Sequence, residues 1–380
     1  MTSNSSQKPH HVCTRCVMDT TDHEIIFDDA GVCNRCKEYE TLLPRLLPKP
    51  QNRDRELREL VARIKEEGKG KEYDCLIGVS GGVDSTYVAY LVKNLGLRPL
   101  AVHLDNGWDT ELAVSNIEKC MKALDIDLYT HVLDWDEFKD LQLAFLRAST
   151  PDSEFPTDHA IYALMIRKAA EIGTRYIISG VNLVTEGITG PKMTANAFDF
   201  KYIEGIHKRF GTRRLTGNFP RLTLANFIYY RLVRKQQLVY LLNYVDYNKK
   251  DAVELMKREL GWQPYTGKHH ESVYTRFFQS YILPVKFGFD KRIMHLSALI
   301  MSGQMTREQA LAELQKEVCA PELIREDKTY VAKKFGISEQ ELDDILAQPP
   351  RQNSEYPSSE RTFLMRCYRL YQQRRTAAAQ

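Results

Sequence analysis

The feature that most constrains the fold is a glycine-rich hexapeptide, SGGVDS, formed by Ser80, Gly81, Gly82, Val83, Asp84 and Ser85. It directly follows a short apolar run, residues 73–79, and directly precedes an apolar-periodic stretch that reaches Leu95. The run predicts a strand, and the stretch predicts a helix with Gly96 as its C-terminal stop. Glycines at such a junction let the backbone approach a bound group, and the first N–H groups of the helix attract anions. The hexapeptide therefore predicts a phosphate-binding loop.

Strand and helix signals alternate on both sides of this loop. Further strands are predicted at residues 99–104, 128–133 and 176–179, and helices at residues 53–68, 111–124 and 157–172. Such alternation is typical of a parallel sheet with helices on both faces. The expected fold class is α/β, with a Rossmann-like parallel sheet.

The chain is expected to form three units. Prolines in residues 42–53 separate a cysteine-rich head (1–50) from the α/β domain (51–245). In the third unit (246–380) strand signals fade, and Thr306 with Gln309 and Ser338 with Glu341 resemble the capping boxes of helices. Residues 348–360 are typical of a linker, and residues 362–375 predict a last, basic helix.

Composition narrows the class of protein. With 380 residues, of which 43% are hydrophobic and 27% charged, the chain should be globular. Lys and Arg (53) nearly balance Asp and Glu (50), and the net charge of +3 disfavours a domain dedicated to nucleic acid. No run approaches the roughly 18 apolar residues of a membrane span, and the first residues lack the apolar core of a signal peptide. We therefore expect a cytoplasmic protein that does not bind membranes.

Four of the eight cysteines form two pairs near the N-terminus: Cys13, Cys16, Cys33 and Cys36. Two Cys-x-x-Cys pairs joined by a short loop can present four thiolates tetrahedrally to Zn²⁺. Because sulfur would fill every position, we expect a structural zinc ion in a zinc ribbon; the alternative is four free buried thiols. The loop between the pairs is rich in carboxylates, which repel the phosphates of a nucleic acid.

The phosphate-binding loop also indicates its chemistry. It lacks the lysine of a Walker A motif and the spacing of a dinucleotide fingerprint. The hydroxyls of Ser80 and Ser85 can add donors to a phosphate, while Asp84 is best explained as a ligand of Mg²⁺ bound to that phosphate. The alternative is an ordinary glycine-rich turn.

Ligands of open parallel sheets gather at the carboxyl ends of the strands. Asp105 ends the second strand, although Asp-Asn-Gly at that place is more often a turn. Gly180 ends a later strand and is followed by Asn182 and Glu186. We expect Asp105 and Gly180 beside the nucleotide, and Asn182 and Glu186 are candidate substrate contacts. A lone carboxylate such as Glu186 could equally complete a metal site or be solvated.

Seven segments together resemble the N-acetyl sugar amidotransferases of bacterial surface-polysaccharide (O-antigen) biosynthesis, in the PP-loop ATP-pyrophosphatase superfamily: CTRCVMDTTD, GVCNRC, SGGVDS, VHLDNGW, PTDHAI, ISGVNLVTEG and GKHHESVYTRFFQSYILPVKFGFDKR. The resemblance spans roughly residues 13–314. It implies that AMP from ATP activates the acetamido oxygen of a nucleotide-linked sugar, for which UDP is the expected carrier. Ammonia then replaces this oxygen, which gives an acetamidino sugar. The resemblance further implies ATP and Mg²⁺ as cofactors, a glutaminase subunit that supplies ammonia, and a barrel subunit as a candidate bridge.

The same resemblance adds candidate site residues in the C-terminal unit. Lys268, Arg276 and Lys286 become candidate ligands of the sugar diphosphate. His269 and Glu271 become candidate catalytic residues that transfer a proton. Without the resemblance, this block would equally be a solvated basic face.

Two residues of the PTDHAI segment gain a role in the same way. Asp158 and His159 become candidate substrate contacts. Without the resemblance, the start of a helix at Thr157 would most simply use this segment as an N-cap.

Two other functions stay open. A tRNA-modifying PP-loop enzyme, which thiolates a base or forms an amidine on it, would need a reactive cysteine by the nucleotide or a basic stripe with stacking aromatics. Only the last helix approaches such a stripe. A zinc-headed scaffold with an inactive loop would have no need of Ser80, Asp84 and Ser85.

A glutaminase within the chain is not expected. It would need a cysteine nucleophile at the N-terminus or on a sharp turn. Residue 2 is Thr2, and flanking glycines are absent from the four remaining cysteines, Cys75, Cys120, Cys319 and Cys367.

Overall fold

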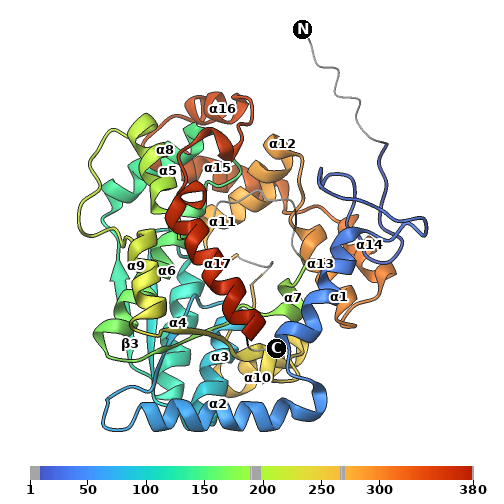
Figure 1. The fold of residues 1–380 in the computed structure, drawn as a ribbon. Helices are drawn as coiled ribbons and strands as arrows, with labels where there is room; N and C mark the ends of the chain where they lie inside the picture. Colours follow the sequence, from blue (N-terminus) through green and yellow to red (C-terminus); the bar gives the residue numbers. More distant parts are fainter. Residues whose placement is uncertain (1–8, 189, 191–197, 266, 268–269, 379–380) are drawn as a thin grey trace.

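The computed structural model describes residues 9–188, 190, 198–265, 267 and 270–378 (Figure 1). At its centre is a five-stranded sheet of β1 (Cys75–Gly78), β2 (Pro99–Asp105), β3 (Leu128–Val132), β4 (Tyr176–Ser179) and β5 (Gln237–Tyr240). The strands lie in the order β3-β2-β1-β4-β5, and neighbouring strands are parallel. The order reverses between β1 and β4, which opens a crevice at their carboxyl ends. The expected α/β class is confirmed.

Helices cover both faces of the sheet because successive strand residues point to opposite sides. On one side, Ile77 and Ile178 share a buried core with α2 (Arg53–Glu67), α3 (Val83–Asn94), α4 (Glu111–Leu124) and α10 (Lys249–Leu260). On the other side, Leu76 and Ile177 share a core with α5 (Trp135–Ala148), α6 (Phe155–Glu171) and α8 (Phe200–Phe210).

The remaining elements surround these two cores. They are α1 (Asn34–Leu46), η1 (Pro50–Asn52), α7 (Leu183–Glu186), α9 (Leu224–Leu232), η2 (Leu241–Tyr244), α11 (Val273–Phe277), the π-helical η3 (Phe278–Ile282), α12 (Leu283–Phe287), α13 (Arg292–Met301), α14 (Arg307–Leu314), α15 (Pro321–Phe335), α16 (Glu339–Ala347), η4 (Asn353–Glu355), η5 (Ser359–Arg361) and α17 (Phe363–Ala378). The helical C-terminal region is thus confirmed, including the capping box of Thr306 and Gln309. No helix in the described part of the chain is both long enough and apolar enough to cross a bilayer.

Some local predictions are wrong. Helix α5 and strand β5 were not predicted, and α6 begins at Phe155 rather than Thr157. Residues 348–360 are not a free linker. Tyr356 is 3% exposed and its hydroxyl donates to the Ala148 carbonyl at 2.9 Å, while the Ser359 hydroxyl and amide bind the Asp199 carboxylate. This segment, which includes η4 and the start of η5, therefore packs against α5 and the start of α8.

The N-terminal head packs against the C-terminal helices, although the two lie at opposite ends of the sequence (Figure 1). Arg307 of α14 donates from Nη2 to the Cys13 carbonyl at 2.8 Å and from Nε to the Cys16 carbonyl at 3.0 Å. The Val17 amide donates to Ser297 Oγ of α13 at 3.2 Å. The head is therefore fastened to α13 and α14 by its backbone.

A buried ion pair joins α11 to α15 in the same region. Arg276 donates from Nε and Nη2 to the two carboxylate oxygens of Asp327 at 2.7 and 2.6 Å. The side chains are only 13% and 5% exposed, and hydrogen bonding to Asp327 raises the pKa of Arg276 despite its burial.

We predict that Asp327→Asn lowers the free energy of unfolding by about 3–5 kcal/mol, because it leaves the Arg276 charge buried without a partner. Urea unfolding followed by circular dichroism measures the change. The matched control is Glu322→Gln on the same helix, since the Glu322–Arg325 pair is 71% and 70% exposed and should contribute little. Similar effects of the two substitutions would contradict this prediction.

Candidate active site

A cavity of about 570 Å³ lies at the carboxyl ends of β1, β2 and β4. Its walls come from the loop after β1, the first turn of α6, α7, and the segments that begin α10 and α11. Nine of the residues singled out in the sequence line it: Ser80, Gly82, Val83, Asp84, Ser85, Asp158, Gly180, Glu186 and Glu271.

The loop after β1 has the backbone of an anion site. Gly81 adopts a left-handed conformation (φ +78°), and a Cβ there would lie 2.8 Å from the Ala113 carbonyl oxygen. Its carbonyl accepts hydrogen bonds from Trp262 Nε1 at 2.9 Å and from the Tyr265 hydroxyl at 3.0 Å. Gly82 precedes α3 without a side-chain cap, so the first N–H groups of α3 keep their affinity for a negative charge. Glycine at position 81 is thus required by both conformation and space.

Serine hydroxyls brace this loop across its two ends. The Ser80 amide donates to Ser85 Oγ at 3.2 Å, and Ser85 Oγ donates to the Gly82 carbonyl at 3.2 Å. A Cβ on Gly180 would lie 2.9 Å from the Ser85 amide, so the end of β4 lies directly against the start of α3. Gly180 therefore lets the end of β4 approach the start of α3 closely.

Two carboxylates lie beside the loop, those of Asp84 and Glu271. The Tyr247 hydroxyl donates to Asp84 Oδ1, and Tyr247 itself is 3% exposed. Glu271 comes from the C-terminal region, and its Oε1 lies so close to Gly82 that a Cβ there would be 2.1 Å away. Carboxylate oxygens beside a phosphate cradle are the donors that Mg²⁺ prefers, so Asp84 and Glu271 fit a magnesium–nucleotide complex.

The Glu271 backbone is attached to the loop after β2. The Thr110 amide donates to the Glu271 carbonyl at 2.8 Å, and the Val273 amide donates to the Trp108 carbonyl at 2.9 Å. An isolated antiparallel bridge pairs Asp109 with Ser272 between them. The C-terminal region thus closes the cavity by a short backbone pairing that local sequence patterns do not reveal.

His103 of β2 also lines the cavity and was not predicted. Its Nδ1 lies 3.0 Å from the Val79 carbonyl and its Nε2 lies 3.2 Å from Asp109 Oδ2. Burial opposes protonation, but the Asp109 carboxylate outweighs it and raises the pKa of His103. A histidine inside a strand pattern gives no signal of this kind in the sequence.

The part of the cavity wall that the start of α6 provides is acidic. Glu154, Thr157 and Asp158 line the cavity there, and Lys291 lines the same cavity. Asp158 is exposed to the cavity, yet surrounding protein atoms desolvate it and Glu154 adds a like charge, which together raise its pKa to about 7. Lys291 acts in the opposite direction.

Several predicted residues do not line the cavity. Asp105 accepts from the Gly107 amide at 2.8 Å and so forms the turn that its sequence favours. Asn182 is buried and caps α7 by accepting from the Thr185 amide at 2.9 Å. His159 is fully buried and its Nε2 accepts from the Leu222 amide at 3.1 Å, which makes it a core residue.

The cationic candidates are likewise placed elsewhere. Arg276 is committed to the ion pair with Asp327 described above. Lys286 donates to the Ile345 carbonyl at 3.0 Å in a separate hollow beside α16, where burial lowers its pKa to about 8. Lys268 and His269 lie outside the described residues.

The four head cysteines converge on one point. Their sulfur atoms lie within 4.8 Å of one another, with Cys16–Cys33 at 3.7 Å, Cys33–Cys36 at 3.6 Å and Cys13–Cys36 at 4.0 Å. A tetrahedral site with Zn–S bonds of about 2.3 Å has sulfur–sulfur edges of about 3.8 Å. The Cys33 amide also donates to Cys13 Sγ at 3.3 Å, which favours the thiolate. The donor set and spacing fit a structural zinc ion.

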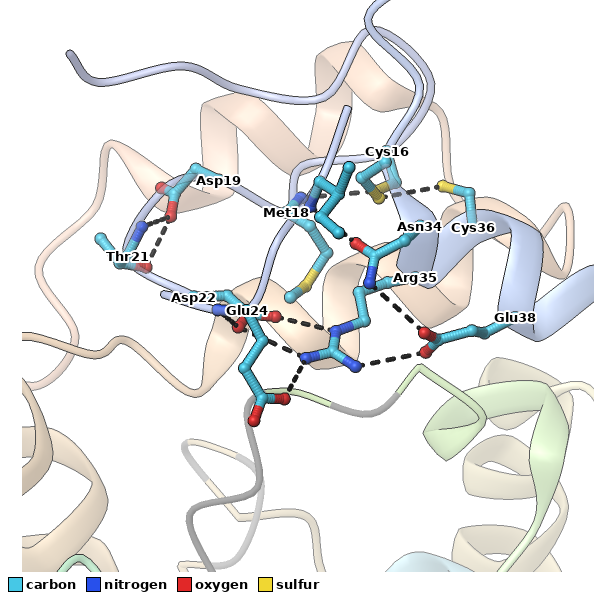
Figure 2. Close-up of polar contacts among 12 residues, drawn as sticks. Cys16, Met18, Asp19, Thr21, Asp22, Glu24, Asn34, Arg35, Cys36 and Glu38 are labelled. Atoms are coloured by element: carbon cyan, nitrogen blue, oxygen red, sulfur yellow. Dashed lines mark hydrogen bonds and ion pairs between the residues drawn. The ribbon is translucent and has the colours of Figure 1, made fainter. Parts of the chain in front are cut away.

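Figure 2 shows Arg35 of α1 paired with carboxylates of the acidic loop in this head. Arg35 donates to Asp22 at 2.8 Å, to Glu24 at 3.0 Å and to Glu38 at 3.2 Å, and it is only 8% exposed. The carboxylates that would repel phosphates are thus partly used to hold α1 against the loop.

The chain is similar to one known protein family and to several known proteins. Residues 271–373 match the family described as LPS biosynthesis protein WbpG-like, C-terminal domain. An uncharacterized protein of Methanocaldococcus jannaschii, MJ1599, is 30% identical over 174 residues, which cover 45% of this chain and 59% of that protein. The tRNA-specific 2-thiouridylase MnmA of Helicobacter hepaticus is 30% identical over 131 residues, which cover 32% of this chain and 37% of that enzyme. The chain thus spans less than two thirds of both relatives.

Among solved structures, the NMN synthetase of Francisella tularensis aligns with 58% of this chain and 99% of its own. The alignment has 15% identity and a TM-score of 0.29.

We predict that Cys33→Ser releases one zinc ion per chain and loosens the head, because a structural site with three sulfur ligands loses much of its binding free energy. Elemental analysis of the purified protein measures the metal, and limited proteolysis reports the loosening. Cys367→Ser, at an exposed cysteine of α17, is the matched control and should keep the zinc. Iron in place of zinc in the unaltered protein would overturn the assignment.

Proposed function

We propose that this chain, which carries a WbpG-like C-terminal domain of lipopolysaccharide (LPS) biosynthesis in residues 271–373, is an ATP-dependent amidotransferase of the PP-loop type. Its substrate would be a cytoplasmic N-acetyl sugar linked to a nucleotide such as UDP. The reaction would replace the acetamido oxygen by nitrogen and release AMP and pyrophosphate.

One observation carries the proposal: a single cavity is built from both halves of the chain. The phosphate loop and Asp84 come from the α/β part, while Glu271, Gln279 and Lys291 come from the LPS-biosynthesis domain. An ATP site and a substrate site that share one cavity are what direct transfer of AMP to a sugar requires.

The geometry supports a first step in which the amide oxygen of the sugar attacks the α-phosphorus of ATP. An O–P bond forms and pyrophosphate leaves with the electron pair of the broken bond. The N–H groups at the start of α3 and the Ser80 hydroxyl would stabilise the leaving pyrophosphate. Mg²⁺, bound by Asp84 and Glu271, would neutralise charge on the phosphates.

A second candidate is thiolation of a tRNA base, which the similarity to the 2-thiouridylase favours. That chemistry needs a reactive cysteine beside the nucleotide. None of the cavity-lining residues in the described part of the chain is a cysteine. Cys75 is fully buried within β1, and this burial raises its pKa, which makes it unreactive. The amidotransferase is therefore the better-supported function.

We predict that the protein, incubated with ATP, Mg²⁺, an ammonium salt and a panel of UDP-N-acetyl sugars, lowers the mass of one sugar by about one unit, since NH replaces O. Mass spectrometry measures the change together with AMP and pyrophosphate. Asp84→Asn is the matched control and should abolish both products without unfolding the protein, because a metal ligand is lost. Mass changes that survive in Asp84→Asn would defeat the proposal.

We also propose that ammonia comes from a glutaminase subunit, with a barrel subunit as a candidate bridge. Apart from Cys367 on α17, the described cysteines are buried, and none of them lines the cavity. Free ammonia is scarce at neutral pH, so delivery by a partner would raise its effective concentration.

The purified chain should accordingly turn over with high ammonium at alkaline pH and fail with glutamine until the partner is added. Turnover is measured as AMP formed per chain with each nitrogen source. Glutamine-dependent turnover by the chain alone would show that it contains its own nucleophile.

A further inference from the structure

Asp158 differs from the other acidic residues of the cavity whose hydrogen-bond partners are given below. It lies in the first turn of α6, and its side chain is exposed to the cavity. Among the described residues, neither a hydrogen bond nor an ion pair engages its carboxylate. Three other acids of the cavity are engaged: Asp84 with Tyr247, Asp109 with His103, and Glu154 with Gln279 Nε2 at 3.4 Å. Asp158 is therefore available to accept a proton from a ligand.

Two charged groups influence the pKa of Asp158. Glu154 precedes it by one helical turn and disfavours its ionisation, and Lys291 favours ionisation from the segment before α13. Glu186 lines the same cavity from α7, and Tyr162 lies one turn farther along α6. Desolvation is the largest influence, and the pKa of Asp158 rises to about 7. A carboxylate of this kind can bind and release a proton near neutral pH.

We infer that Asp158 is the base that accepts a proton from ammonia as it adds to the activated sugar. This inference rests on the proposed amidotransferase function. In the step, the nitrogen lone pair forms a C–N bond to the carbon of the adenylated amide, which gives a tetrahedral intermediate bearing –NH₃⁺. Asp158 takes one proton from this nitrogen. The C–O bond then breaks, AMP leaves with the electron pair, and a cationic amidine remains.

The position of Asp158 relative to the loop agrees with this order of events. The phosphate cradle is formed by the loop after β1 and α3, whereas Asp158 belongs to α6 on the other core. Pyrophosphate release and ammonia addition would thus use different walls of one cavity. Glu154 acts as a positioning residue that works through Asp158, because its negative charge helps to keep the pKa of Asp158 close to neutral.

The test separates the two steps in the full-length protein. Exchange of labelled pyrophosphate into ATP, measured with the UDP-sugar but without ammonium, reports adenylation. Amidine formed from ammonium, measured by mass spectrometry, reports both steps. Asp158→Asn should leave exchange within about twofold of the unaltered protein and reduce amidine formation at least about 100-fold, the contribution typical of a general base.

A pH profile adds a readout that a merely structural role would not move. The rate of amidine formation per free ammonia should rise as pH increases through about 7 and then level, because Asp158 must be ionised to accept a proton. In Glu154→Gln the rise should occur at lower pH, since removal of the like charge lowers the Asp158 pKa.

Three outcomes would overturn the inference. Equal losses of exchange and amidine formation in Asp158→Asn would assign it to substrate binding, and unchanged amidine formation would remove it from the reaction. An unshifted profile in Glu154→Gln would show that Asp158 does not control the rate. Absence of exchange in the unaltered protein would instead defeat the proposed function, and this inference with it.

Discussion

The left-handed turn at Gly81 is the constraint on which the rest of the site depends. Only glycine fits there, because a side chain would collide with the Ala113 carbonyl of α4, and Trp262 and Tyr265 fix the peptide by donating to its carbonyl. The turn decides where α3 begins and thus where its first N–H groups point. It also places Asp84 in that first turn. One local conformation therefore sets the direction of the first N–H groups of α3 and the position of the Asp84 carboxylate together.

Hydrogen bonds of the C-terminal helical region connect the four-cysteine head to Asp84, which follows this turn. The side chain of Gln304, between α13 and α14, donates to the Tyr247 carbonyl at 2.9 Å, and Tyr247 holds Asp84. Three residues later in the chain, Arg307 donates hydrogen bonds to the carbonyl oxygens of Cys13 and Cys16. A continuous set of contacts thus runs from the four-cysteine head to the loop after β1. The head can in this way help to hold the Asp84 carboxylate in place without lining the cavity.

The sequence predicted what depends on local chemistry and missed what depends on long-range pairing. The strand, glycine loop and α3 follow from neighbouring residues, and so does the cysteine pattern, because spacing along the chain fixes the geometry. The sequence could not show that His159 faces the core, because adjacent residues of a helix point in directions about 100° apart and Asp158 beside it faces the cavity. It could not show the ion pair of Arg276 either, because the partner, Asp327, lies on another helix. Helix α5 was not predicted because three of its ten buried residues, Glu137, Asp140 and Gln142, are polar and interrupt the apolar periodicity.

The charges around the cavity bear on what it can hold. Asp84, Asp109, Glu154, Asp158, Glu186 and Glu271 line it, against two lysines, Lys249 and Lys291, among the described residues. A site for free polyanions would have the opposite balance. Backbone N–H groups at the start of α3 can bind phosphate without adding a full positive charge, so an acidic cavity can still accept ATP together with Mg²⁺. The same acidity would oppose a free nucleic-acid backbone and stabilise a cationic amidine as it forms. The charges of the cavity would therefore suit the proposed reaction, which starts from a metal-bound anion and ends with a cation.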